Sequence, residues 1–100
     1  MELREIQRKV KELVGEKDRM VGEMFLLSVL VEEVGELAEA LRKRDRNMAL
    51  EELADVLFMT LSIANQLDVD LEGKLVEKYL SRSLEEISRS WHDVPWKKQG

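Results

Sequence analysis

The strongest constraint on the fold comes from two long apolar segments joined by a short polar connector. Residues 20–43 and 48–67 repeat apolar side chains at intervals of three and four residues, the spacing of a helix that buries one face. The connector, around residues 42–47, is polar, and Asp45 or Asn47 can cap the helix that follows. A link this short makes the two helices antiparallel neighbours. We therefore predict a helical hairpin at the centre of the molecule.

Each helix of this hairpin carries two acids three residues apart. On a helical wheel of about 100° per residue, Glu33 and Glu52 each fall at the centre of the apolar face. Glu36 and Asp55 fall at the edge of the same faces. Counted from the connector, Glu36 and Asp55 lie about level along the antiparallel pair. We therefore expect four carboxylates within about two helical turns of one another.

The remaining chain also has a helical pattern. Two more helices and a tail are expected outside the hairpin: residues 2–18, residues 71–90 after the N-cap Asp70, and residues 91–100. Glycines near residues 15–22 predict a bend or short loop there. No strand pattern is present, and one proline and five glycines leave most of the chain free for helix. The prediction is one all-α domain, residues 1–100, built as an antiparallel four-helix bundle-like subunit.

The second helix of the hairpin predicts an oligomer. From Leu53 to Ala64 almost every residue is apolar, and Leu50, Phe58 and Leu61 lie on the side away from Glu52. A helix that is apolar all round is buried all round, which thin helices in a chain of 100 residues can hardly achieve. We therefore expect the second side to meet another copy of the chain, as a two-fold homodimer.

Composition excludes several classes of protein. With 21 acids against 16 bases and no basic run, the chain is not expected to bind duplex nucleic acid. No apolar stretch is long enough to cross a membrane, and the charged start has no signal-peptide core, so a cytoplasmic protein is expected. The absence of cysteine excludes disulfides and thiolate zinc sites.

Carboxylates gathered on a buried face call for a cation. They repel one another and lose hydration unless positive charge lies among them. Oxygen ligands without Cys or His favour Mg²⁺, or Mn²⁺, and such a site can orient a polyphosphate and activate a water. A di-iron site needs Glu-x-x-His, and the single histidine, His92, lies in the predicted tail. The competing interpretation is that acids at this spacing form an ordinary solvated helix face.

At these acids the sequence resembles the MazG-like nucleotide pyrophosphohydrolases of the all-α nucleoside triphosphate pyrophosphatase superfamily. The family pattern is Glu-Glu-x-x-Glu, a spacer, then Glu-x-x-Asp. Here it is Glu32-Glu33-Val34-Gly35-Glu36, fifteen residues, then Glu52-Leu53-Ala54-Asp55. The resemblance covers roughly residues 20–80. It implies cleavage of nucleoside triphosphates between the α and β phosphates, with Mg²⁺ held by Glu33, Glu36, Glu52 and Asp55, in dimers or tetramers.

The resemblance also indicates residues that contact substrate. Family members often have Lys and, four residues later, Asn in the last helix, where this chain has Lys78 and Arg82. We predict that both bind phosphate, although a row shared with Lys74 is also typical of a solvated face. Related phosphoribosyl-ATP pyrophosphatases carry Tyr-His soon after the Asp. This chain has Leu57-Phe58 there, which makes that activity a weaker match.

Two tryptophans mark the predicted tail. Trp91 is predicted to stack on the nucleotide base, and the competing interpretation is that Trp91 and Trp96 anchor the tail. His92 is expected to be a tail residue and not a general base. The hypothesis is therefore a Mg²⁺-dependent nucleotide pyrophosphohydrolase. The alternative is a non-enzymatic helical module for oligomerisation or nucleotide binding.

Overall fold

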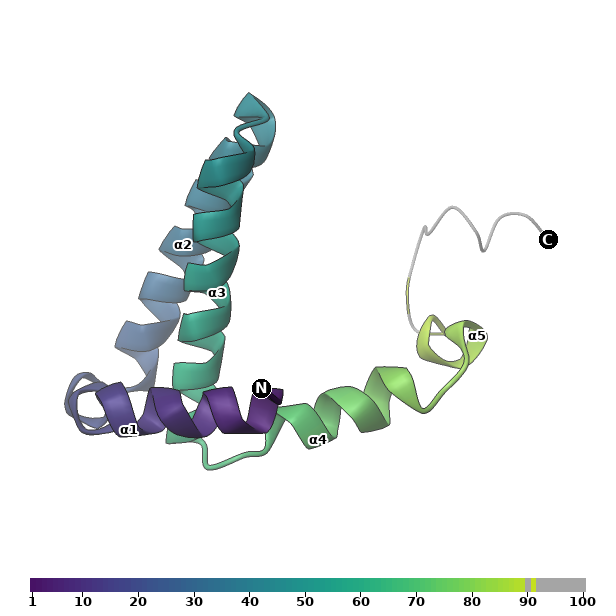
Figure 1. The fold of residues 1–100 in the computed structure, drawn as a ribbon, viewed down its shortest axis with the longest axis horizontal. Helices are drawn as coiled ribbons and strands as arrows, with labels where there is room; N and C mark the ends of the chain where they lie inside the picture. The colour runs from purple at the N-terminus through teal and green to yellow at the C-terminus, as the bar shows by residue number, and fades with distance from the viewer. Residues whose placement is uncertain (90, 92–100) are drawn as a thin grey trace.

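The computed structural model describes residues 1–89 and 91, and its regular secondary structure there consists of helices joined by short turns (Figure 1). Its elements are α1 Leu3–Val21, α2 Glu23–Lys43, α3 Arg46–Gln66, α4 Leu71–Leu75, the π-helical turn η1 Val76–Leu80, and α5 Leu84–Ile87. No strand occurs among these elements, so the predicted all-α class is confirmed. Within the same residues, no helix is long and apolar enough to cross a membrane.

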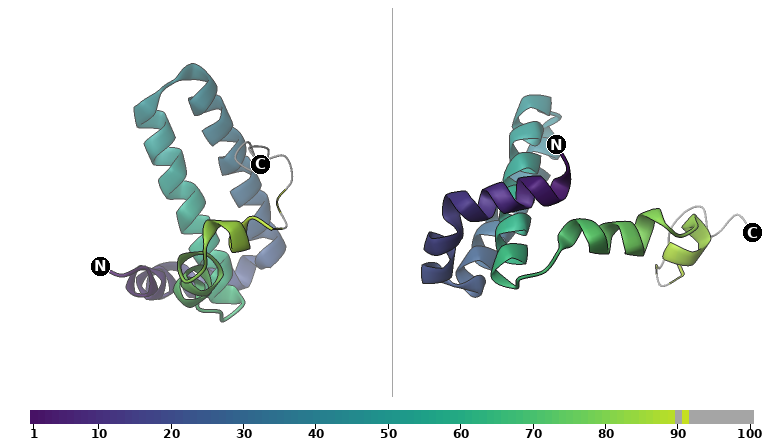
Figure 2. Two further views of the ribbon diagram at one scale, coloured as in Figure 1. Left: turned by 90° about the vertical axis from the view of Figure 1, so that its right-hand side faces the viewer. Right: turned by 60° about the horizontal axis from the view of Figure 1, so that its bottom comes forward.

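Helices α2 and α3 form the predicted antiparallel hairpin, and α1 crosses its base (Figures 1 and 2). The turn between them is fixed by local hydrogen bonds. Arg44 takes the left-handed conformation with φ 54°, and the amides of Arg44 and Asp45 donate to the carbonyls of Leu41 and Ala40. Asp45 then caps α3, accepting from the Met48 amide at 3.0 Å. Of the two predicted caps, the structure uses Asp45.

Helix α1 is longer than predicted, and the bend expected near residues 15–22 is wrong in its extent. The helix runs through Gly15 to Val21, and only Gly22, with φ 86°, breaks the chain. A glycine inside a helix costs only about 0.5–1 kcal/mol relative to alanine. Packing outweighs that cost here, because α1 lies on α3 and the Gln66 side-chain amide donates to the Gly15 carbonyl at 3.2 Å.

The core lies where α1 crosses the hairpin. Val10 of α1, Leu26 of α2 and Leu61 of α3 are all buried. Leu61 precedes Asn65 by one turn, and Asn65 bonds to Gln7 of α1, so α1 covers the side of α3 that carries Leu61. The expectation that another copy covers this whole side of α3 is therefore wrong near Leu61.

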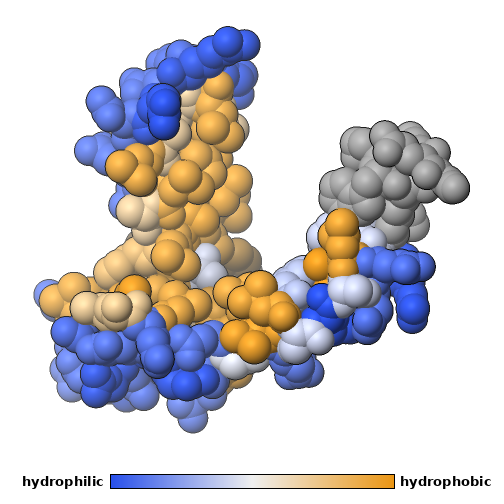
Figure 3. Space-filling view, turned by 45° about the vertical axis from the view of Figure 1, so that its right-hand side comes forward, coloured by the Kyte–Doolittle hydropathy of each residue, from blue (hydrophilic) through white to orange (hydrophobic). Residues whose placement is uncertain are grey.

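Elsewhere on the hairpin, large apolar side chains face solvent in the single chain (Figure 3). On α3 they are Leu50, Leu53 and Leu57; on α2 they are Met24, Phe25, Leu27, Val31, Val34 and Leu41. We name these residues the hairpin apolar surface. Figure 3 shows apolar side chains covering much of the visible side of the hairpin above α1. The prediction that α3 is apolar on more than its core face is confirmed.

The last helical segment differs most from its prediction. In place of one helix over 71–90, the chain forms α4, η1 and α5 in series, which we name the arm. Serines cause the interruptions: the Ser81 amide and hydroxyl both donate to the Val76 carbonyl, and the Ser83 hydroxyl caps α5 by accepting from the Glu86 amide. The arm leads away from the hairpin, with α1 as its main packing partner, so the single chain is not a closed four-helix bundle (Figure 1).

Candidate active site

The hairpin brings three of the four predicted acids together. Glu33 and Glu36 lie one turn apart on α2, and Glu52 lies opposite them on α3. One carboxylate oxygen from each lies within 4.8 Å of the other two. Glu52 is buried, and Glu33 and Glu36 are half-buried. We name these three residues the acid cluster.

The fourth predicted acid and two acidic neighbours lie outside this cluster. Asp55, one turn beyond Glu52 on α3, is exposed. Glu32 is also exposed, while Glu39 pairs with Lys43 at 2.9 Å, an ion pair that lowers the pKa of Glu39. The helical-wheel separation of Glu33 and Glu36 from their acidic neighbours therefore agrees with the structure.

The acid cluster has an unbalanced negative charge. The Glu33 and Glu52 Oε2 atoms are buried and have no hydrogen-bond partner. Among the described residues, no ion pair involves any of the three acids. Hydrogen bonding to Glu33, which requires a proton, raises the pKa of Glu52 to about 7, and burial and the charge of Glu36 add to the effect.

This arrangement suits a hard divalent cation. Mg²⁺ and Mn²⁺ prefer carboxylate oxygens, and the two unpartnered oxygens offer ligand atoms that the protein itself leaves unsatisfied. A cation would also remove the mutual repulsion of the three carboxylates. The donor set therefore fits a metal centre of the predicted kind.

The arm residues predicted to bind phosphate do not reach the acid cluster within one chain. Lys78 lies on η1 with its Nζ 5.3 Å from the centre of the Tyr79 ring, and Arg82 lies 3.8 Å from Glu86. Lys74 pairs with Glu77 at 3.7 Å. The segment that carries these three bases leads away from the hairpin (Figure 1).

Trp91 also lies with the arm. Its ring is 6.5 Å from the ring of Tyr79, at an interplanar angle of 41°. His92 and Trp96 lie outside the described residues. The sequence interpretation counted Tyr79 only as an apolar position, and the structure makes it the shared neighbour of Lys78 and Trp91.

A buried polar network between α1 and the start of the arm was also not predicted from the sequence. Gln7 is among the most buried polar residues and bonds to Asn65 of α3. The signal was present in the sequence, because Gln7 occupies a helical position between Leu3 and Val10, inside the apolar stripe of α1. A polar residue on a buried face predicts a hydrogen-bond partner in another element.

Comparison with known proteins agrees with the geometry. The sequence pattern of the MazG nucleotide pyrophosphohydrolase domain matches residues 21–85, well over half of the chain, from the start of the hairpin into α5. The chain is also similar to the uncharacterized protein YpjD of Bacillus subtilis (strain 168), with 29% identity over 102 residues, covering 87% of this chain and 91% of that protein. On the extent of the domain match, the chain belongs to the MazG nucleotide pyrophosphohydrolase domain family.

Proposed function

We propose that this protein is a Mg²⁺-dependent nucleoside triphosphate pyrophosphohydrolase that releases pyrophosphate and a nucleoside monophosphate. The observation that carries the proposal is the acid cluster, with two buried carboxylate oxygens that have no partner. Glu33, Glu36 and Glu52, with Asp55 from the next turn of α3, are the proposed metal-binding and catalytic residues. Mn²⁺ has the same ligand preference and is expected to substitute.

The proposed reaction is an in-line displacement at the α-phosphorus. A water oxygen bonds to that phosphorus as the bond to the bridging α–β oxygen breaks, and pyrophosphate leaves. One carboxylate of the cluster orients the water and accepts its proton. Mg²⁺ supplies charge neutralisation for the polyphosphate and lowers the pKa of water. Because the acids stand on two packed helices, they are held in place before substrate binds.

We further propose that the protein acts as a homodimer, or as a tetramer built from such dimers, with all of residues 1–100 in one domain. Leu50 is 69% exposed and Val31 62%, and both belong to the hairpin apolar surface. Contiguous apolar surface of this kind is typical of an interface between proteins. Since Lys78 and Arg82 do not reach the acids of their own chain, their proposed phosphate contacts are made at the site of a neighbouring copy.

The test is a nucleotide panel. The full chain is incubated with NTPs and dNTPs in Mg²⁺, in Mn²⁺ and in EDTA, and the phosphorus products are identified by NMR. We expect pyrophosphate and a monophosphate from at least one nucleotide, and no turnover in EDTA. Release of orthophosphate and a diphosphate would contradict the cleavage position, and binding without any turnover would favour the non-enzymatic module. A native mass of 11.7 kDa at micromolar concentration would contradict the oligomer.

A further inference from the structure

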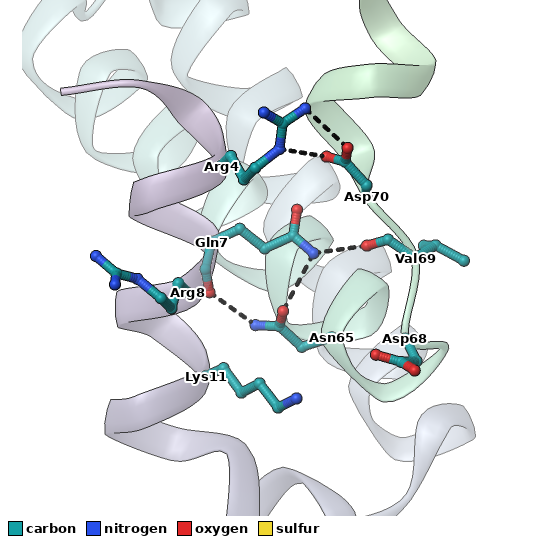
Figure 4. Close-up of a pocket in the computed structure, with 8 residues that line it drawn as sticks. All are labelled: Arg4, Gln7, Arg8, Lys11, Asn65, Asp68, Val69 and Asp70. Atoms are coloured by element: carbon teal, nitrogen blue, oxygen red, sulfur yellow. Dashed lines mark hydrogen bonds and ion pairs between the residues drawn. The ribbon is translucent and has the colours of Figure 1, made fainter.

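Two side-chain amides, that of the buried Gln7 and that of the half-buried Asn65, join α1 to the base of the arm. Gln7 Nε2 donates to Asn65 Oδ1 at 3.1 Å and to the Val69 carbonyl at 2.8 Å, and Gln7 Oε1 accepts from the Leu71 amide at 3.3 Å. Asn65 Nδ2 returns a bond to the Gln7 carbonyl at 3.0 Å. Figure 4 shows the two amides facing each other between α1 and α3, with Val69 beside them. We name Gln7 and Asn65 the amide latch.

Arg4 adds a second attachment one turn earlier on α1. Its Nη2 lies 2.8 Å from Asp70 Oδ2 and its Nη1 lies 3.2 Å from Glu72 Oε2. The Arg4 amide also donates to Glu72 Oε1 at 3.1 Å. Because Glu2, at the N-cap of α1, makes no side-chain cap bond, Glu72 of the arm caps α1 in its place.

Because Gly73 has no side chain, it leaves space for the contact between Arg4 and Asp70. A Cβ at position 73 would lie 2.7 Å from Asp70 Oδ2 and 3.8 Å from Arg4 Nη2. The Asp70 carboxylate that caps α4, by accepting from the Gly73 amide at 3.2 Å, also receives the Arg4 guanidinium. The first turn of the arm therefore fits closely against α1.

A groove of about 340 Å³ opens along this joint, lined in part by Arg8, Lys11 and Asp68. The polar side chains of Gln7 and Asn65, which also line the groove, already form hydrogen bonds within the protein. Both hydrogens of the Gln7 amide are donated to protein acceptors, and Asn65 uses its oxygen and one hydrogen on Gln7. The groove is therefore better explained as the side of a joint between two elements than as a ligand site.

We propose that Gln7, Asn65 and Arg4 are positioning residues, which set the direction of the arm and thereby place its phosphate-binding residues. This inference rests on the proposed function, in which Lys78 and Arg82 of the arm contact the substrate. The arm's main packing partner in the chain is α1, so the amide latch and Arg4 are what hold its direction. Helix α1 lies almost wholly outside the matched family region, residues 21–85, so the proposal adds a part that the family match does not cover.

The test compares full-length variants with matched controls. Arg4→Met removes the two ion pairs of the Arg4 side chain. Arg8→Met is the control, because Arg8 lies one turn along α1 and its one ion pair among the described residues is with Glu5 of the same helix, at 3.9 Å. Arg4→Lys keeps the charge, and Gln7→Leu removes the latch with little change in volume. Because Gln7→Leu leaves buried groups unpaired and can unfold the protein, the exposed Arg4 variants keep the test decisive.

Three measurements are needed: hydrogen–deuterium exchange of the arm amides, steady-state KM and kcat for the best nucleotide, and Mg²⁺ affinity. In Arg4→Met we expect exchange over residues 74–80 and KM each to rise about three-fold or more, with kcat and Mg²⁺ affinity unchanged. Arg4→Lys is expected to recover most of the loss, and Arg8→Met to match the parent protein. Where Gln7→Leu folds, its effect is expected to exceed that of Arg4→Met.

Three outcomes would overturn the proposal. If the arm amides exchange hydrogen at the same rate in Arg4→Met, Gln7→Leu and Arg8→Met, the contacts of Arg4 and Gln7 do not hold the arm. Faster exchange with unchanged KM would show that they have a structural role only. Absence of turnover in the parent protein would refute the proposed function and the claim about KM, while the exchange comparison would still decide whether the latch holds the arm.

Discussion

The hairpin and the arm both carry charged side chains but arrange them in opposite ways. On the hairpin, Glu33, Glu36 and Glu52 point at one another, with buried oxygens that the protein leaves unpaired. On the arm, two pairs of opposite charges are local and exposed to solvent, Arg82 with Glu86 and Lys74 with Glu77. Carboxylates held close together repel one another, and a positively charged partner from outside the protein relieves this repulsion. Surface charges that are already paired need no such partner.

The hairpin and the arm differ in how far one chain brings their charged residues together into a site. Two packed helices bring the three acids of the cluster together within one chain, and we propose that the cluster binds a cation there. The bases of the arm are proposed to contact substrate only at the site of a neighbouring copy. The predictions below test this contrast, beginning with the largest expected effect.

Neutralising the acid cluster should abolish activity without unfolding the protein. Glu33→Gln or Glu52→Gln is expected to lower kcat/KM by about 100-fold or more, because each removes a charged oxygen ligand. The metal-free variants should be at least as stable as the parent protein, since a buried carboxylate has lost its repulsion. Steady-state kinetics and urea unfolding measure the two effects. Glu32→Gln, an exposed neighbour, is the control and should change kcat/KM less than two-fold.

Metal binding should depend on pH through Glu52. The pKa of Glu52 is about 7 in the folded protein, above its ordinary value of 4.5. Protonation of Glu52 therefore stabilises the metal-free fold. This contribution is fully present below about pH 4.5 and is lost as the pH rises through about 7. Mg²⁺ must displace this proton, so its apparent affinity should fall about ten-fold from pH 8 to pH 6. Calorimetric titration in both buffers measures the change. Equal affinity at the two pH values would contradict a shared proton in the empty cluster.

On the arm, removal of one base should have a smaller effect that appears in KM. Lys78→Met is expected to raise the KM for the nucleotide about ten-fold by removing a charge-assisted hydrogen bond to phosphate. Lys74→Met is the matched control, because Lys74 lies one turn earlier and pairs with Glu77. If both variants behave like the parent protein, the basic row is a solvated face and the substrate contacts lie elsewhere.

The smallest effects are expected at the two joints of the chain. Arg44 at the hairpin turn and Asp68 before the arm both have positive φ, of 54° and 56°. Arg44→Gly should stabilise the fold by about 0.5–1 kcal/mol, because arginine disfavours the left-handed region. Asp68→Gly should gain only a few tenths of a kcal/mol, since aspartate tolerates that region better. Urea unfolding at matched protein concentration tests the ranking, and a larger gain at Asp68 would reverse it.

The hairpin could be predicted from the sequence because its signals are local and periodic. The acids that share its apolar face are placed by helix geometry alone, so Glu33 and Glu52 were found without any tertiary information. Asp45 and Asn47 were both candidate caps by their positions in the connector, and the structure uses Asp45. Whether Asp55 joins the cluster when metal is bound stays a prediction.

The arm could not be predicted equally well, because its shape depends on competing local bonds and on distant partners. The apolar spacing of residues 71–90 fits one helix, but the Ser81 and Ser83 hydroxyls bond backbone groups that a continuous helix would use. Its direction depends on Arg4 and Gln7, more than sixty residues earlier, and a helical wheel carries no information about such pairs.

The cap that Glu72 provides to α1 has a consequence for the order in which the chain folds. The hairpin depends on contacts that are near in sequence, so α2 and α3 can form as soon as both have been synthesised. The cap of α1 forms later, because Glu72 is 68 residues away from the Arg4 amide from which it accepts a hydrogen bond. Helix α1 can therefore pack on α3 once residue 66 is present, and its N-terminal cap is expected to be among the last of its contacts to form.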